Sequence, residues 1–86
     1  MARKTRENIA KWVAKAVSTA LDTDGNEVIA EYVANAGDYQ RVSVKAAGAP
    51  IEEDEFYAAT VDDRTIRFQL LEDRGNDEYL LRVRID

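Results

Sequence analysis

The spacing of apolar residues changes along this chain of 86 residues, from a helical period to a period of two. Ile9, Val13, Ala16, Val17 and Ala20 recur at the spacing of one helix face. From residue 28 onward, apolar and polar residues alternate in short runs that are separated by turn-forming residues. We therefore expect an α+β fold, in which an N-terminal amphipathic helix packs on one face of an antiparallel sheet of four to five strands.

The ends of the helix are marked by residues that favour capping. Thr5 is suited to the N-cap, and Glu7 places a negative charge in the first turn, where the helix dipole favours it. The helix is expected to stop at the run Asp22-Thr23-Asp24-Gly25-Asn26. Alternate acids in this run resemble a calcium loop, but Glu27 stands where that loop needs glycine. A turn is therefore predicted here, and no metal site.

The alternating runs predict five strands, near residues 28–34, 42–46, 55–61, 65–71 and 78–85. Gly37 is expected at a left-handed position in the first hairpin, and residues 73–76 are expected to form the last turn. Pro50, followed by acids, also allows one helical turn before the third strand. The helix is thus followed by strands in the order α-β-β-β-β-β.

Aligning the apolar faces of neighbouring strands gives an expected register. In the first hairpin this alignment sets Glu31 opposite Arg41, which is a favourable pair of opposite charges. Between the last two strands it sets Arg67 opposite Arg82, and like charges in such positions are unfavourable. We therefore expect a carboxylate or a ligand to compensate the two arginines.

Length and composition limit the classes of function. A chain this short forms one domain, 1–86, with little apolar area to spare for a deep substrate pocket; residues 1–4 are expected to be a flexible basic leader. The sequence contains no cysteine and no histidine, so thiolate and imidazole chemistry are excluded. We expect no enzyme activity and no cofactor, and the absence of a long apolar run favours the cytoplasm.

Charge is unevenly distributed along the chain. Five of the twelve cations but one of the seventeen acids lie in residues 1–15, although the net charge is -5. Lys11 and Lys15 are one turn apart on the polar side of the helix and form a row that can follow phosphates. Nucleic-acid binding through this basic helix is one alternative, although a pI of about 4.7 is opposite to the usual basic footprint.

The outer face of the predicted sheet is the first candidate partner-binding surface. Its alternate positions mix cations with aromatic residues, namely Arg41, Lys45, Arg67, Arg82, Arg84, Tyr39 and Phe56, and the apolar Ile29, Val33 and Leu80 also fall there. Such a mixture can bind an acidic protein surface, a nucleic acid or a second copy of the chain. Alternatively, it is a solvated face on which arginine stems cover apolar neighbours.

Acidic loops are the second candidate surface. They contain Glu52, Glu53, Asp54, Glu55, Asp62 and Asp63. Small acidic proteins, including some from phages, block nucleic-acid-handling enzymes by imitating phosphate charge, although acidic turns are also usual in solvated hairpins.

Small size, uneven charge and apolar groups on the expected solvent face favour a protein-binding module. We expect an inhibitor or adaptor, of the kind that a phage or mobile element encodes, which acts by surface occlusion rather than by chemistry. A structural homodimer that pairs through sheet faces or edges is the principal alternative. No membrane partner is expected.

Overall fold

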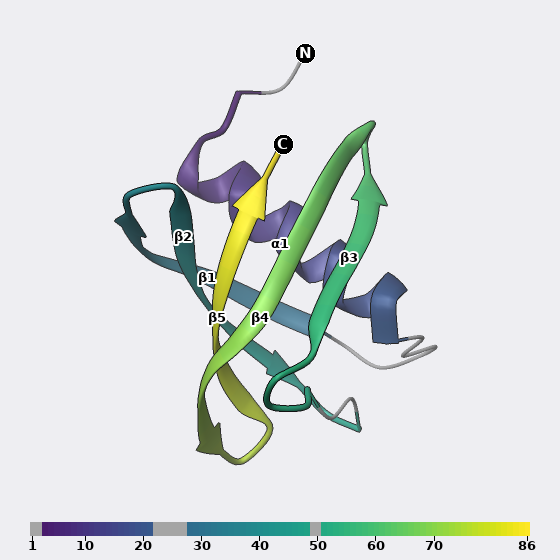
Figure 1. Ribbon diagram of the computed structural model, residues 1–86, viewed down its shortest axis with the longest axis vertical. Coiled ribbons are helices and arrows are strands. Elements are labelled where there is room, and N and C mark those ends of the chain that lie inside the picture. The colour runs from purple at the N-terminus through teal and green to yellow at the C-terminus, as the bar shows by residue number, and fades with distance from the viewer. Residues whose placement is uncertain (1–2, 22–27, 49–50) are drawn as a thin grey trace.

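Helix α1 packs against one face of a five-stranded antiparallel sheet (Figure 1). The computed structural model describes residues 3–21, 28–48 and 51–86. The elements are α1 (Arg6–Leu21), β1 (Val28–Ala36), β2 (Tyr39–Ala46), β3 (Phe56–Val61), β4 (Arg64–Gly75) and β5 (Glu78–Ile85). This arrangement confirms the α+β fold and the element order that the periodicity predicts.

The strands lie in the order β1-β2-β5-β4-β3, so that the last strand of the chain occupies the centre of the sheet. The hairpin of β1 and β2 and the meander of β3, β4 and β5 meet where β5 pairs with β2. Helix α1 contacts both edge strands, β1 and β3, and it lies across the back of the sheet in Figure 1. No element of the described ranges covers the opposite face of the sheet, which we call the outer face.

The core lies between α1 and the inner face of the sheet. Ile9, Val13, Ala16 and Val17 of the helix are buried, as the helical spacing predicts, and Trp12 beside them is also buried. From the sheet, alternate positions of β2, β4 and β5 complete the core, namely Val42, Val44, Ala46, Ile66, Phe68, Leu81 and Val83. Burying each of the larger of these side chains stabilises the fold by about 1.5–3 kcal/mol.

In the first hairpin, the predicted pairing of Glu31 with Arg41 is wrong. Glu31 pairs with Ser43, and Arg41 pairs with Ala34. The strands run further than the alternation indicates, to a connection of two residues that contains Gly37 at a φ of 71°, and a bulge at Val33 shifts the register. The left-handed position predicted for Gly37 is confirmed.

The last hairpin also differs from the predicted register. Arg67 pairs with Arg84 rather than with Arg82, because β4 continues through the predicted turn as far as Gly75. Irregularities between Leu70 and Glu72 and again near residue 74 absorb the extra residues. The turn itself is formed by Asn76 and Asp77, both of which have positive φ angles.

Two predicted features involve residues outside the described ranges. The turn at residues 22–26 lies outside the described residues. Pro50 does as well, and residues 51–55, which follow it, form a turn without a helix. Ile51 in this segment is buried against the core, which fixes the approach to β3.

Candidate binding face on the outer side of the sheet

Cross-strand pairing places the outer-face side chains in rows that run perpendicular to the strands. One row crosses β3, β4, β5 and β2 through Phe56, Gln69, Arg82 and Arg41. The next row contains Ala58, Arg67 and Arg84. Because partners on neighbouring strands lie about 4.5–5.5 Å apart, both rows bring side chains from distant parts of the chain together.

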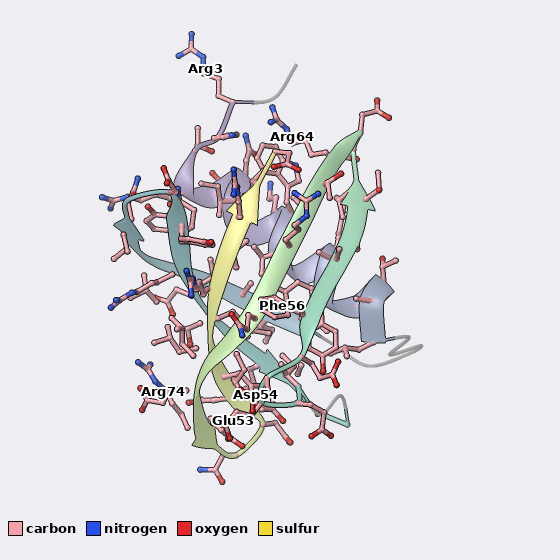
Figure 2. The ribbon with its side chains drawn as sticks, in the orientation of Figure 1. Arg3, Glu53, Asp54, Phe56, Arg64 and Arg74 are labelled. Atoms are coloured by element: carbon pink, nitrogen blue, oxygen red, sulfur yellow. The ribbon has the colours of Figure 1, made fainter. Side chains whose placement is uncertain are left out.

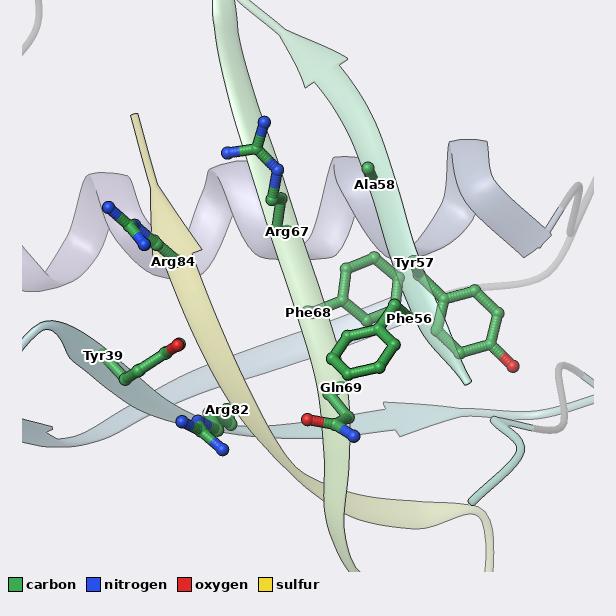
Figure 3. A pocket seen from close by; sticks show the side chains of 9 residues that line it. All are labelled: Tyr39, Phe56, Tyr57, Ala58, Arg67, Phe68, Gln69, Arg82 and Arg84. Carbon is green, nitrogen blue, oxygen red and sulfur yellow. The ribbon is translucent and has the colours of Figure 1, made fainter. Parts of the chain in front are cut away.

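A shallow groove of about 460 Å³ lies over these two rows. Figure 3 shows Phe56 above Gln69 on one side, with Arg82 and Tyr39 on the other. Arg67 and Arg84 stand together at one end of the groove. The groove therefore combines aromatic rings with guanidinium groups.

Phe56 is the most exposed large apolar residue on this face. Its exposed fraction is 79%, although it lies in a regular strand beside Gln69. Nothing in the inner core requires an aromatic residue at this position, because its side chain points away from α1. A bare aromatic ring among cations is typical of residues that dominate the free energy of protein binding.

Two pairs of arginines face each other across neighbouring strands. Arg41 is the partner of Arg82, and Arg67 is the partner of Arg84. Arg67 forms an ion pair with Asp86, and the guanidinium carbon of Arg82 lies 3.8 Å from the centre of the Tyr39 ring. These contacts compensate one member of each pair.

The remaining charges of the two pairs are unbalanced. Within the described part of the chain, neither Arg41 nor Arg84 has a carboxylate oxygen within 4.0 Å. Arg84 is exposed and lines the groove, whereas Arg41 lines a smaller adjoining hollow beside Leu71. The outer face thus keeps guanidinium groups available to a ligand.

The outer face contains all seven of the cationic and aromatic residues that alternation assigns to it. Lys45 stands apart from the groove, between Ile29 and Glu78 on the neighbouring strands. Ile29 and Val33 are exposed, as expected. Leu80, however, is buried although it lies on this face, because it belongs to the central strand and has neighbours on both sides.

Two residues in or beside the groove were not predicted from the sequence. Gln69 forms part of its floor, and the alternation along β4 does place this residue on the outer face. Asp86 compensates Arg67, and the hairpin pattern gives no signal for this contact because Asp86 follows the last strand.

The acidic residues do not form one continuous surface. All six of those predicted are exposed, but residues 52–55 precede β3 whereas Asp62 and Asp63 follow it. A strand of six residues separates the two groups by about 20 Å. Figure 2 shows Glu53 and Asp54 at the lower end of the molecule, close to the turn between β4 and β5.

Burial and the acids at this lower end of the molecule raise the pKa of the Tyr79 hydroxyl. Burial raises the pKa of its hydroxyl above 10.0, and the negative charges of Asp73, Asp77 and Glu52 raise it further, against a backbone hydrogen bond with Ile51 that lowers it. Tyr79 is therefore a buried phenol near acidic residues.

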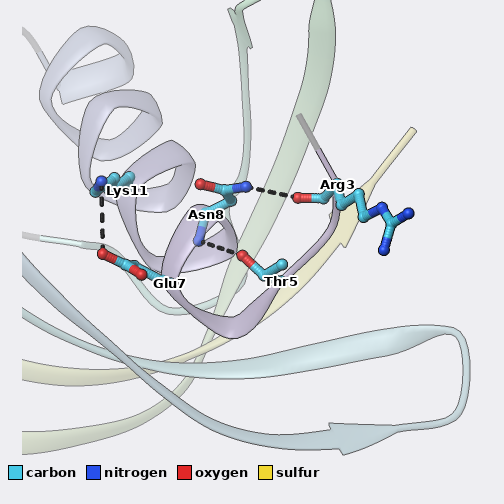
Figure 4. Close-up of polar contacts among 5 residues, drawn as sticks. All are labelled: Arg3, Thr5, Glu7, Asn8 and Lys11. Atoms are coloured by element: carbon cyan, nitrogen blue, oxygen red, sulfur yellow. Dashed lines mark hydrogen bonds and ion pairs between the residues drawn. The ribbon is translucent and has the colours of Figure 1, made fainter. Parts of the chain in front are cut away.

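The basic N-terminal segment is engaged in contacts within the chain. The backbone N–H of Asn8 donates to Thr5 Oγ1 at 3.1 Å, which confirms the predicted N-cap, and its side chain donates to the Arg3 carbonyl (Figure 4). Lys11 forms an ion pair with Glu7, and Lys4 Nζ donates to the Ile85 carbonyl. Lys15 is exposed on the same helix.

The described ranges contain neither a metal-binding cluster nor a membrane-spanning helix. No group of three or more acidic side chains in them is arranged to hold a metal ion. Among the same residues, α1 falls short of the length and apolar character that a membrane-crossing helix requires.

The fold and the groove define an α+β domain with a cationic and aromatic sheet face that none of its described elements covers. No protein-family model matches the chain, and neither the curated proteins nor the solved structures include a significant match.

Proposed function

We propose that this protein is a non-enzymatic protein-binding module whose outer face covers an acidic surface on a partner protein. It acts as an adaptor or inhibitor by surface occlusion. The observation that carries the proposal is the exposed Phe56 ring in a groove lined by Arg67, Arg82 and Arg84.

The composition of the groove suits a protein partner. Arginine, tyrosine and phenylalanine are enriched in protein interfaces, and they concentrate the binding energy when the contact excludes water. Arg82 is already held against Tyr39, so less side-chain entropy is lost when it binds a carboxylate. Arg84 supplies an exposed guanidinium group, which can bind a carboxylate through two parallel hydrogen bonds.

The outer face is favoured over the acidic loops because its groups converge. Phe56 and Gln69 are direct partners, and Arg82 is the next residue in the same row. The acidic turns at the two ends of β3 are instead too far apart to act as one compact surface.

Affinity capture from the source cell with matched variants tests the proposal. We expect the wild-type protein to retain a partner that Phe56→Ala and Arg84→Gln lose. Lys15→Gln on the exposed side of α1 removes one cation away from the outer face and should retain the partner. Retention by both outer-face variants, or loss by the helix variant alone, would contradict the proposal.

Homodimerisation through β1 is a second candidate, and it has its own structural support. β1 is an edge strand, and it exposes Ile29 and Val33. Self-association by way of the outer faces is less favourable, because it would bring their arginine rows together. Sedimentation at tens of micromolar tests this candidate: a dimer that Ile29→Lys dissociates would support it, and a monomer would exclude it.

A further inference from the structure

Arginines line one end of the outer-face groove, and a run of acids lies in the chain just before Phe56, outside the lining of the groove. Arg67 and Arg84 occupy the row of Ala58, and Phe56 lies one row further toward the beginning of β3. The exposed acids of residues 52–55 come immediately before Phe56 in the chain. From the row of Ala58 to the segment before β3, the order is therefore cationic, apolar and then acidic. Figure 2 shows Asp54 and Glu53 together below Phe56.

We propose that this groove takes an extended segment of the partner that is itself dipolar. The inference rests on the protein-binding function proposed above. The segment presents acids to Arg67 and Arg84, an apolar side chain to the Phe56 ring, and a basic residue to the acids at residues 52–55. The groove thus selects for a change of charge along the segment as well as for net charge.

The size of the groove suits a short peptide segment. Side chains on one face of a strand repeat about every 7 Å, which is the rise of two residues. About six extended residues therefore reach from the arginine end, past Phe56, to the acids that precede β3. Phe56 presents enough ring surface for one apolar side chain, because its exposed fraction is 79%.

A polynucleotide fits this pattern less well than a dipolar peptide. A nucleic-acid strand carries negative charge at every phosphate. A strand that stacks on Phe56 and pairs with Arg84 would extend toward Glu53 and Asp54, whose charges repel it. The same acids attract a lysine or arginine of a peptide.

Fluorescence anisotropy with three labelled synthetic peptides tests the inference. Each has a central leucine: the dipolar peptide has two glutamates on one side and two lysines on the other, and the other two peptides carry four glutamates or four lysines. We expect the wild-type protein to bind the dipolar peptide most tightly, by about two- to fivefold for each favourable charge contact. The preference should weaken as salt increases.

Variants that reverse one charge, either among the acids before Phe56 or at the arginine end of the groove, provide the decisive comparison of peptide preference. Glu53→Lys halves the negative charge of residues 52–55, from -4 to -2, so this variant should lose part of its preference for the dipolar peptide over the four-glutamate peptide. Arg84→Glu should instead shift the preference toward the four-lysine peptide. Glu7→Lys introduces the same charge change on α1, away from the outer face, and should leave the wild-type order unchanged.

The outcomes separate this inference from the proposed function. If the wild-type protein binds the four-glutamate peptide at least as tightly as the dipolar one, the inference is overturned and an acidic partner remains. If no peptide binds while Phe56→Ala still abolishes partner capture, the recognition of a linear segment is overturned alone. Tighter binding of an oligothymidylate than of any peptide, lost in Phe56→Ala, overturns both.

Discussion

Arg67 and Arg84 are direct partners across β4 and β5, and both side chains stand on the outer face (Figure 3). Asp86 forms an ion pair with Arg67, whereas no carboxylate among the described residues lies within 4.0 Å of the Arg84 guanidinium group. Like charges in opposed positions destabilise a sheet. Arg84 therefore lowers the free energy of unfolding, and no ion pair among the described residues offsets this effect.

Arg84→Gln is expected to raise the free energy of unfolding by about 0.2–1 kcal/mol, because it removes this repulsion. Arg67→Gln should raise it less, since that change also removes the ion pair with Asp86. Urea unfolding of both variants measures the difference. A decrease in stability with Arg84→Gln would show that this arginine serves the fold rather than a ligand.

Phe56→Ala is expected to change the free energy of unfolding by less than about 0.5 kcal/mol, because the ring is exposed. Phe68→Ala is the matched control on the inner face of the neighbouring strand, where the ring is buried and stacks on Tyr57. The control should lose about 3–5 kcal/mol. Equal losses in urea unfolding would mean that Phe56 is a structural residue.

The β3–β4 turn is expected to gain stability from a change of sequence. Asp62 and Asp63 have φ angles of 50° and 66°, which are the left-handed positions that an Asn-Gly pair occupies most easily. The double variant Asp62→Asn and Asp63→Gly should raise the free energy of unfolding by about 1 kcal/mol. Asp62→Asn with Asp63→Asn removes the same charges without glycine and should gain less.

Stability is expected to fall at high pH because of Tyr79. The folded pKa of its hydroxyl is raised above the ordinary value of 10.0, so the unfolded chain loses this proton at a lower pH than the folded chain. The contribution of Tyr79 is therefore complete below pH 10 and is lost as the pH rises through the folded pKa.

Thermal melts across this pH range, with Tyr79→Phe for comparison, measure the effect. The variant lacks the titrating hydroxyl, so its stability should decline less steeply between pH 9 and pH 12. Parallel decline of the two proteins would contradict the assignment. Absorbance at the tyrosinate band gives the titration of the wild-type protein directly.

The fold class was predictable because its main signals are local. Helical spacing from Ile9 to Val17 and the capping side chain of Thr5 locate α1, and alternation locates the strands. The face of the sheet on which each strand residue lies was also predictable, since alternate residues of a strand point to opposite sides. The cationic and aromatic residues of the outer face were therefore assigned to the correct side of the sheet.

Register was not predictable, because the apolar pattern shows neither where a turn lies to within a residue or two nor where a bulge adds a residue. The first turn lies at Gly37 and Asp38, later than predicted, so Arg41 pairs with Ala34 although the bulge at Val33 takes back one residue of the shift. The continuation of β4 to Gly75 likewise moves the partner of Arg67 from Arg82 to Arg84. The predicted pairing of Arg67 with Arg82 was wrong, although each of the two arginines does have another arginine as a cross-strand partner. The Asp86 contact depends on this register and so could not be found from the pattern either.

The most direct test of the outer-face proposal is a map of backbone amide chemical-shift changes when the captured partner is added to the labelled protein. The proposal predicts that the largest changes lie around Phe56, Arg67, Arg82 and Arg84, and that the exposed side of α1 changes little. Changes confined to α1, or to the β1 edge, with the groove unaffected, would contradict it.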